Sequence, residues 1–351
     1  MRAARVLGYK LPSDAVRIPT PMNLPQRLAW LCLLSLPIAC SSNKAKGEMT
    51  DEQKVGLYYE RALRYYEMRE LDRCQDQVQR GLKIEPKNER LMLMLGRCHQ
   101  TRGKLEDILI AEKIFREHPA KKDYRVHLCL GGCLERKGSY YMEASEKVAS
   151  GERFTEAADP NVRADELAAQ AKASWKEALT SYQAALDRFP GSFEALNGLM
   201  RTNVLLEQFD ESFAWSERLL QSIGESNEVF QKRLKELEAR GSATVDIEKA
   251  LLANSDLQVQ ALLLRSDILH QKGQFREALA ELDKAVVLDP SLAEIYARRG
   301  QVLSQLGEYQ RSNDSVEQFL SLSTDPFESP NIRRAFALIE SNKQAMKTAV
   351  R

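Results

Sequence analysis

Glycine and proline are scarce in this sequence of 351 residues, at 17 and 12, and aromatic residues make up only 7%. No runs of alternating Val, Ile and Thr indicate β-strands. Long stretches consist instead of Ala, Leu, Glu, Lys, Gln and Arg, which are good helix formers. An excess of one charge is also missing, because 51 Lys and Arg residues balance 50 Asp and Glu residues. The composition therefore predicts an all-α protein and gives no reason to expect a nucleic-acid partner.

Motifs of catalysis are missing as well. The sequence contains no Gly-rich phosphate loop, no Gly-x-Ser-x-Gly elbow and no His-Glu-x-x-His pair. Its four histidines, at positions 99, 118, 127 and 270, are far apart, and no serine or cysteine has a base and an orienting group in a recognisable pattern. We therefore predict a protein that is not an enzyme and that uses no cofactor and no metal. The alternative of an enzyme's repeat domain is disfavoured because we expect residues 327–351 to be too few for a catalytic domain.

The sequence has one isolated apolar run, from Leu28 to Ala39, with Arg27 before it and Cys40 directly after it. A basic flank, a short apolar core and a small residue before a polar stretch are the parts of a secretory signal. The run is too short to span a bilayer comfortably. Residues 1–40 are therefore predicted to be a signal segment. Because residues 1–21 lack signal character, Met22 is the expected true start.

The end of this run resembles a bacterial lipobox, in which the cysteine is lipidated and becomes the mature N-terminus. It reads Leu36-Pro37-Ile38-Ala39-Cys40, with Pro37 at the position that is usually Leu. The resemblance implies lipidation of Cys40. Residues 41–54 would then be a polar tether, and a serine rather than an aspartate after the cysteine implies the periplasmic face of the outer membrane. A cytoplasmic protein in which Cys40 is never processed is the alternative.

A period of 34 residues organises the rest of the chain. The clearest unit begins at Val259 and the next at Ala293. Each predicts an amphipathic helix, a turn that contains Gly273 or Gly307, and a second helix. The same spacing fits earlier segments, which predicts six hairpins. Their ranges are 55–88, 89–121, 122–192, 193–226, 259–292 and 293–326.

Small and bulky residues recur within this period at fixed places. Small residues let the two helices of a hairpin approach closely, and bulky residues fill the holes between hairpins. This pattern resembles the tetratricopeptide repeat (TPR) family. The resemblance implies a right-handed α-α superhelical solenoid over residues 55–326. The residues that carry it in the last two units are Leu262, Leu269, Ala278, Leu282, Ala285, Pro290, Tyr296, Gly300, Leu303, Val316 and Phe319.

Two stretches depart from the period and are predicted to be helical inserts, near 138–175 and 225–258. In the first, Tyr140 to Ala149 predicts a short helix, and Asp159 followed by Pro160 predicts the N-cap of a long helix that ends at Phe189. The inserts either space the stack or project toward a partner. Residues 327–351 predict the capping helix that repeat arrays need for solubility.

Four cysteines lie in the first three predicted repeats: Cys74, Cys98, Cys129 and Cys133. A single Cys-x3-Cys spacing does not make a zinc site, which usually shows two such pairs. Small apolar cysteines at close-packed positions are the favoured interpretation. In an exported protein a disulfide between Cys74 and Cys98 is an open alternative, because connectivity cannot be deduced from sequence.

In TPR proteins the first helices line a concave groove that receives an extended or helical peptide. The resemblance implies that the residues at the matching spacing in this sequence line such a groove. Asn197 and Arg201 lie one helical turn apart, so both could hold a carboxylate, as in the clamp of chaperone-binding members, although the clamp lysines are absent. A solvated polar groove is the favoured alternative at these two residues. The predicted groove residues are Tyr59, Leu63, Tyr66, Leu93, Arg97, Val126, Leu130, Asn197, Arg201, Leu263 and Asp267.

The predicted function is a protein–protein interaction scaffold that is tethered to a membrane by its N-terminal lipid. A lipobox-like signal followed by six repeats resembles the outer-membrane lipoproteins that assist assembly of type IV pilus secretins. That resemblance is one of architecture. A cytoplasmic TPR scaffold or co-chaperone without a lipid anchor is the alternative.

Overall fold

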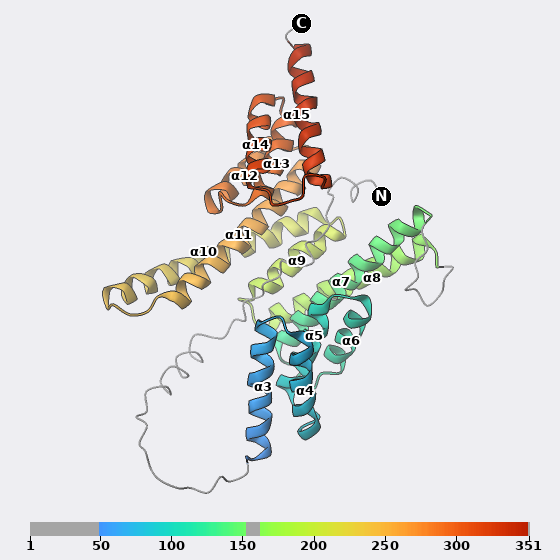
Figure 1. Ribbon diagram of the computed structural model, residues 1–351, viewed down its shortest axis with the longest axis vertical. Helices are drawn as coiled ribbons and strands as arrows, with labels where there is room; N and C mark the ends of the chain where they lie inside the picture. Colours follow the sequence, from blue (N-terminus) through green and yellow to red (C-terminus); the bar gives the residue numbers. More distant parts are fainter. Residues whose placement is uncertain (1–48, 152–161, 350–351) are drawn as a thin grey trace. The chain divides into compact units, whose positions relative to one another are not determined.

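The computed structural model describes residues 49–151 and 162–349, which form two compact units, 49–121 and 122–349 (Figure 1). The predicted signal segment, with Met22 and Cys40, lies outside the described residues. Within the described part every regular element is an α-helix, and successive helices pack as antiparallel pairs. This confirms the predicted all-α fold class and the six hairpins, and the arrangement is consistent with a TPR solenoid.

Residues 49–121 contain two hairpins and residues 122–349 contain four, followed by one further helix. In each hairpin, the helix that comes first along the sequence is called the first helix. The pairs are α3 (Asp51–Glu67) with α4 (Leu71–Ile84), α5 (Glu89–Arg102) with α6 (Leu105–Glu117), α7 (Tyr124–Ala149) with α8 (Ala164–Arg188), α9 (Phe193–Leu205) with α10 (Phe209–Ala239), α11 (Val245–Gln271) with α12 (Phe275–Leu288) and α13 (Ala293–Gln305) with α14 (Tyr309–Leu322); α15 (Pro330–Ala349) follows.

Several of the first helices are capped at their N-terminus by a side chain. Thr50 and Gln53 form a reciprocal capping box at α3, so this helix begins four residues before the expected start of the array at residue 55. Asn88, Asp123 and Ser192 each accept a backbone N–H at the start of α5, α7 and α9. The caps satisfy donors that the helix itself leaves unpaired.

The turns inside five hairpins share one backbone feature, a residue in the left-handed region. Gly103, Gly273 and Gly307 have φ of 76°, 75° and 76°, and glycine adopts this region at no steric cost. This confirms the predicted turns at Gly273 and Gly307. Arg69 and Glu207 occupy the same place with φ of 61° and 60°, where a side chain costs free energy.

The third hairpin is longer than the period predicts. Residues 140–149 are not a separate helix but the end of α7, which runs unbroken from Tyr124. Helix α8 begins at Ala164 with Arg163 at its N-cap, and the predicted N-cap at Asp159 lies outside the described residues. Gly138 does not break α7, because it lies where α7 and α8 approach most closely. A Cβ atom there would lie 2.4 Å from Nε1 of Trp175 and 2.8 Å from the Ala171 carbonyl oxygen.

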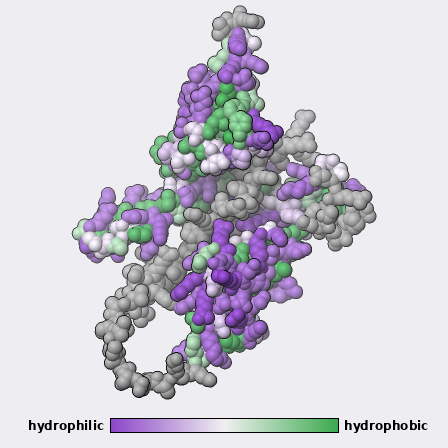
Figure 2. Space-filling view, in the orientation of Figure 1, coloured by the Kyte–Doolittle hydropathy of each residue, from purple (hydrophilic) through white to green (hydrophobic). Residues whose placement is uncertain are grey.

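The predicted helical insert near 225–258 is present as the end of α10 and the start of α11. The two helices lie side by side and antiparallel (Figure 1). Val229, Val245 and Leu252 are exposed on them, and hydrophobic patches alternate there with hydrophilic ones (Figure 2). Among the residues that the structure describes, no helix combines the length and the hydropathy that a bilayer crossing needs.

Each unit has its own apolar core. In residues 49–121 it is formed by α3, α4 and α5 around Val55, Ala62, Val78, Leu91 and Met94. In residues 122–349 the largest cluster joins α7, α8, α9, α10 and α11, and further clusters continue into α12–α14 and α15. Helix α15 covers the last hairpin through its buried face of Ile332, Ala335, Ile339 and Asn342, which is what the capping prediction requires. A single hairpin cannot bury both its faces, so these stacked layers hold the fold together.

Candidate protein-binding faces on the first helices

The first helices of residues 49–121 present a partly exposed apolar face. Tyr59, Leu63 and Tyr66 follow one another at helical spacing on α3, and all three pack against the core while remaining half-buried. Leu93 on α5 is 9% exposed and belongs to the core, whereas Arg97 one turn later is half-buried. Four of the five predicted groove residues in this unit are therefore accessible to a partner.

Tyr66 is held in place by two contacts with α5. Its hydroxyl lies 2.9 Å from Oγ1 of Thr101, and the guanidinium of Arg97 lies 4.7 Å from its ring centroid. A cation over an aromatic ring and a bonded hydroxyl both restrict ring rotation. The face is thus ordered before any partner binds, which lowers the entropic cost of binding.

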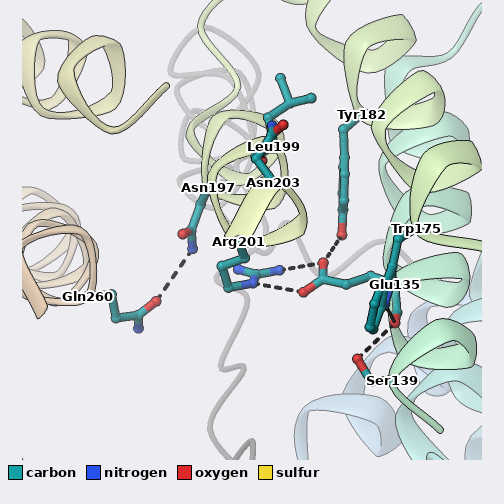
Figure 3. A network of polar contacts seen from close by, with 9 residues as sticks. All are labelled: Glu135, Ser139, Trp175, Tyr182, Asn197, Leu199, Arg201, Asn203 and Gln260. Carbon is teal, nitrogen blue, oxygen red and sulfur yellow. Dashed lines mark hydrogen bonds and ion pairs between the residues drawn. The ribbon is translucent and has the colours of Figure 1, made fainter. Parts of the chain in front are cut away.

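The first helices of residues 122–349 carry a polar network around Glu135 of α7 (Figure 3). Arg201 of α9 donates from Nε to Oε1 at 3.0 Å and from its terminal nitrogen to Oε2 at 2.9 Å. Tyr182 of α8 donates its hydroxyl to Oε2 at 2.6 Å. The Glu135 side chain is 7% exposed and that of Arg201 is 32% exposed. One buried carboxylate therefore joins three helices through charge-assisted hydrogen bonds.

Two glycines position Tyr182 for this contact. A Cβ atom at Gly131 of α7 would lie 2.7 Å from the Tyr182 ring, and one at Gly198 of α9 would lie 2.5 Å from it. The ring thus fills a slot between two helices that only glycine leaves open. The indole Nε1 of Trp175 donates to the Glu135 carbonyl oxygen at 3.2 Å, which fixes the backbone of α7 at the same place.

Charge and burial in the network act on the protonation of its members. Burial, and then the Glu135 carboxylate, raise the pKa of Tyr182 well above its ordinary value, so its hydroxyl stays protonated and can donate. Burial lowers the pKa of the Arg201 guanidinium, but Glu135 and Tyr182 together raise it by more. Arg201 is therefore charged, and its charge is matched inside the protein.

Asn197 lies one turn before Arg201 on α9 but is not part of this ion pair. Its Nδ2 donates to Oε1 of Gln260 on α11 at 3.4 Å, a long contact. Its Oδ1 is buried and accepts no hydrogen bond, and the whole residue is 5% exposed. A buried acceptor without a donor costs free energy in the free protein. Any N–H group that reached Asn197 Oδ1 would recover it.

The remaining predicted groove residues of this unit divide by polarity. Asp267 of α11 is buried and accepts from Nε of Arg298 on α13 at 3.0 Å. Val126 and Leu263 are buried in the packing, whereas Leu130 is half-buried. A series of polar pairs therefore links the first helices of neighbouring hairpins. The pairs are Arg201 with Glu135, Asn197 with Gln260, and Asp267 with Arg298.

An open cleft of about 510 Å³ lies on the same unit between α10, α11 and α12. Its apolar lining includes Leu220 and Leu262. Its charged lining is paired internally, because Arg265 contacts Glu281 and stacks 3.8 Å from the Phe213 ring centroid. With its cation already paired, this cleft is a weaker candidate for ligand recognition than the first-helix faces.

The described residues contain no group of three or more His, Cys, Asp or Glu side chains placed to hold a metal ion. The carboxylate of Glu135 has three donors and is not available as a base in this arrangement. The polar network therefore fixes helices and offers no evident acid–base chemistry.

Sequence reasoning missed Glu135, Tyr182 and Gln260 as partners of the predicted clamp. Glu135 lies 66 residues before Arg201, and no local spacing joins them. A signal was nevertheless present, since a glutamate between Cys133-Leu134 and Arg136 stands at a position of α7 that the helical period assigns to the buried side. Such a residue needs a buried partner.

A model of the TPR repeat family matches residues 267–307, which cover the end of α11 and all of α12 and α13. No curated protein matches the sequence. The match identifies a TPR repeat in this chain, and the stacked antiparallel pairs are consistent with a TPR solenoid. Proteins of this fold are scaffolds that bind other proteins, typically without catalysis.

Two solved structures resemble the fold over most of the chain. One is described as the functional characterization of Pseudomonas aeruginosa pilF; it shares 13% identity, covers 82% of this chain and 98% of its own, and has a TM-score of 0.52. The other is PilW, described as a widely conserved type IV pilus biogenesis factor, with 13% identity, coverage of 81% and 99%, and a TM-score of 0.51. At this identity the likeness concerns the fold alone.

Proposed function

We propose that the chain is a membrane-tethered adaptor that binds a peptide or helix of a partner protein on its first-helix faces. The observation that carries the proposal is the ordered, half-buried face of Tyr59, Leu63, Tyr66 and Arg97 on residues 49–121. Aromatic side chains and arginine dominate the energy of protein interfaces. A face of this kind that stacking does not fully cover favours contact with a partner.

The chemistry of this face favours an amphipathic segment. Tyr59 and Leu63 offer adjacent apolar surface on α3, against which Leu, Ile or aromatic side chains of a partner helix can pack at positions i and i+4. Arg97 remains partly accessible beside Tyr66, so a carboxylate at the edge of the segment gains a charge-assisted contact. The proposed partner segment is therefore apolar on one face and acidic at its margin.

The first helices of residues 122–349 would contact a partner in a different way. The Oδ1 of Asn197 has no donor but is buried, so a backbone N–H of an extended segment reaches it only when the long contact between Asn197 and Gln260 opens. Arg201 is already paired with Glu135. We therefore retain Asn197 as a binding residue and assign Arg201 to holding α9 against α7 in the unbound protein.

For location, we propose lipidation of Cys40 and residence at the periplasmic face of the outer membrane, with a role in assembly of an envelope complex such as a pilus secretin. The lipobox-like sequence supports the tether. The resemblance of the fold to PilF and PilW agrees with the assembly role without establishing it. A cytoplasmic scaffold or co-chaperone is the competing function.

Site-directed photocrosslinking in cells tests the binding face. A photoreactive residue at position 59 or 66 should give one defined adduct, whereas the same residue at Gln79 or Lys83, exposed on α4 of the same unit, should not. Once mass spectrometry has identified the partner, combined Tyr59→Ala and Tyr66→Ala should weaken its affinity at least roughly tenfold. Equal adduct yields at all four positions would contradict the proposal that a partner binds this face.

A variant whose stability is nearly that of the wild type tests the role of Asn197 in binding. Asn197→Leu removes a buried acceptor that has no donor, so the free energy of unfolding should change by less than about 1 kcal/mol. Affinity for the crosslinked partner should nevertheless fall several-fold. An unchanged affinity would remove Asn197 from the binding face.

Palmitate labelling and membrane fractionation in a Gram-negative host test the tether. Wild type should be labelled and sediment with the outer membrane, and Cys40→Ala should be unlabelled. Cys74→Ala is the matched control and should be labelled like wild type. A soluble, unlabelled and uncleaved wild-type chain would favour the cytoplasmic scaffold.

A further inference from the structure

Cys74 of α4 and Cys98 of α5 place their sulfur atoms together inside residues 49–121. The two Sγ atoms lie 2.8 Å apart, and both residues are 0% exposed. Two sulfur atoms that are not bonded to each other prefer a separation of roughly 3.6 Å or more, because each is large and polarizable. The packing of α4 against α5 has thus brought the thiols to a distance from which a bond forms with little movement of the backbone.

The surroundings of the pair are apolar. Val78 and Met94 lie in the same cluster, so apolar side chains pack against the pair. Cys129 and Cys133 belong to the other unit and lie four residues apart on a single helix, α7. A pair on two different helices constrains the unfolded chain far more than a pair within one helix.

From this geometry we propose that Cys74 and Cys98 form a structural disulfide, which staples the first hairpin of the array to the second when the protein meets an oxidising compartment. The proposal stands apart from the binding face and from the tether, because it rests only on packing within residues 49–121. It assigns to the two residues a covalent modification rather than mere space filling.

Thiol–disulfide exchange with a small-molecule disulfide forms the bond with all atoms balanced. The Cys74 thiolate attacks one sulfur of the external disulfide and expels the first small thiolate. Cys98 then loses its proton to solvent and attacks the Cys74 sulfur, which expels the second. Two protein thiols are oxidised and one external disulfide is reduced to two thiols. Because both sulfurs are buried, the first step requires local opening of α4, near the end of the array.

The electrostatics of the pair favour formation of a thiolate. The hydrogen bond between the two sulfurs lowers the pKa of the thiol that accepts it and raises that of the thiol that donates it, and either sulfur can be the donor. Burial raises the pKa of both thiols, whereas the charges of Arg97 and Arg102 lower it. The two arginines therefore assist the thiolate attack that starts the exchange.

Mass spectrometry of the full chain after incubation with oxidised glutathione tests the proposal. We expect trypsin to release a cross-linked pair of peptides, 74–80 and 98–102, each with its cysteine at the N-terminus. Dithiothreitol should separate them. The combined variant Cys129→Ala and Cys133→Ala should give the same cross-linked pair.

Hydrogen exchange provides a second readout that needs no cysteine variant. Closing a loop between positions 74 and 98 should slow exchange of amides in α4 and α5 at least roughly tenfold on oxidation, while amides of α13 and α14 stay unchanged. The proposal is overturned if prolonged oxidation leaves both thiols open to alkylation after denaturation, or if Cys74 and Cys98 are found bonded only to glutathione or to other cysteines.

Discussion

The first helices of the two units are held to their neighbours by different chemistry. In residues 49–121 an aromatic ring and a cation, Tyr66 and Arg97, join α3 to α5 at a partly exposed face. In residues 122–349 a carboxylate that is nearly buried, Glu135, receives Arg201 and Tyr182 and joins α7, α8 and α9. The first arrangement leaves apolar surface for a partner, whereas the second consumes its charges internally. One repeat pattern can thus leave a partly exposed apolar face at one place and form a rigid support at another.

Loss of the Glu135 carboxylate should have the largest effect on the stability of residues 122–349. Glu135→Ala removes three hydrogen bonds and leaves the Arg201 charge and the Tyr182 hydroxyl without their partner, which should destabilise residues 122–349 by about 3 kcal/mol. Urea unfolding followed by tryptophan fluorescence, with Trp175 and Trp215 in this unit, measures the loss. Glu146→Ala, at an exposed position of α7, is the control. Equal losses in both variants would mean that the network contributes nothing.

Gly198→Ala should have the next largest effect, because the new methyl group meets the Tyr182 ring from one side while Gly131 bounds the other. Overpacking of this kind costs about 1–3 kcal/mol. Gly224→Ala is the matched control inside a helix of the same unit, where an added Cβ meets nothing within 4 Å. It should stabilise by about 0.5–1 kcal/mol. The prediction fails if both variants shift the unfolding midpoint in the same direction.

Alkaline pH should weaken residues 122–349 through Tyr182. Burial and Glu135 raise its pKa in the folded state, so above pH of about 10 the unfolded chain loses this proton while the folded chain retains it. The contribution is fully present below that pH and declines above it by up to about 1.4 kcal/mol per pH unit. Unfolding free energies between pH 8 and 11 should show a shallower decline for Tyr182→Phe; parallel curves for the two proteins would contradict the assignment.

The smallest effects are expected at the turns. Arg69→Gly in one unit and Glu207→Gly in the other relieve a left-handed conformation of a residue with a side chain, and each should stabilise its unit by about 0.5–1 kcal/mol. Gly273→Ala should destabilise by a similar amount. Thermal unfolding of the three variants checks the signs, and a destabilising Arg69→Gly would show that this side chain has a compensating contact.

The 34-residue period predicted the hairpins because it records local packing. Gly273 and Gly307 stand at turns, and Ala278 and Ala285 at close approaches of helices, so each position can be interpreted from its neighbours along the chain. Gly138, at the start of the first predicted insert, is harder to interpret from its neighbours. A glycine in a helix serves equally as a turn signal or as a contact site, and only the distant Trp175 decides between them.

The candidate site was predicted in part for the same reason. Helical spacing identified Asn197 and Arg201 as neighbours on one face of α9, but in the structure only Arg201 pairs with a carboxylate. That carboxylate is Glu135 of the same chain. Pairing across 66 residues depends on how three helices stack, which the local pattern does not contain. The role of the predicted groove residues in binding stays a prediction.

The pairing of Arg201 has a consequence for what the protein can select. A carboxylate that arrives from solution must displace one that is attached to the same chain, and an attached competitor acts at an effective concentration far above that of any soluble peptide. Chain ends, which carry a carboxylate in every protein, therefore gain little at this position. At Arg201 the protein should therefore gain little from a partner's terminus and accept segments from the interior of a partner's sequence equally well.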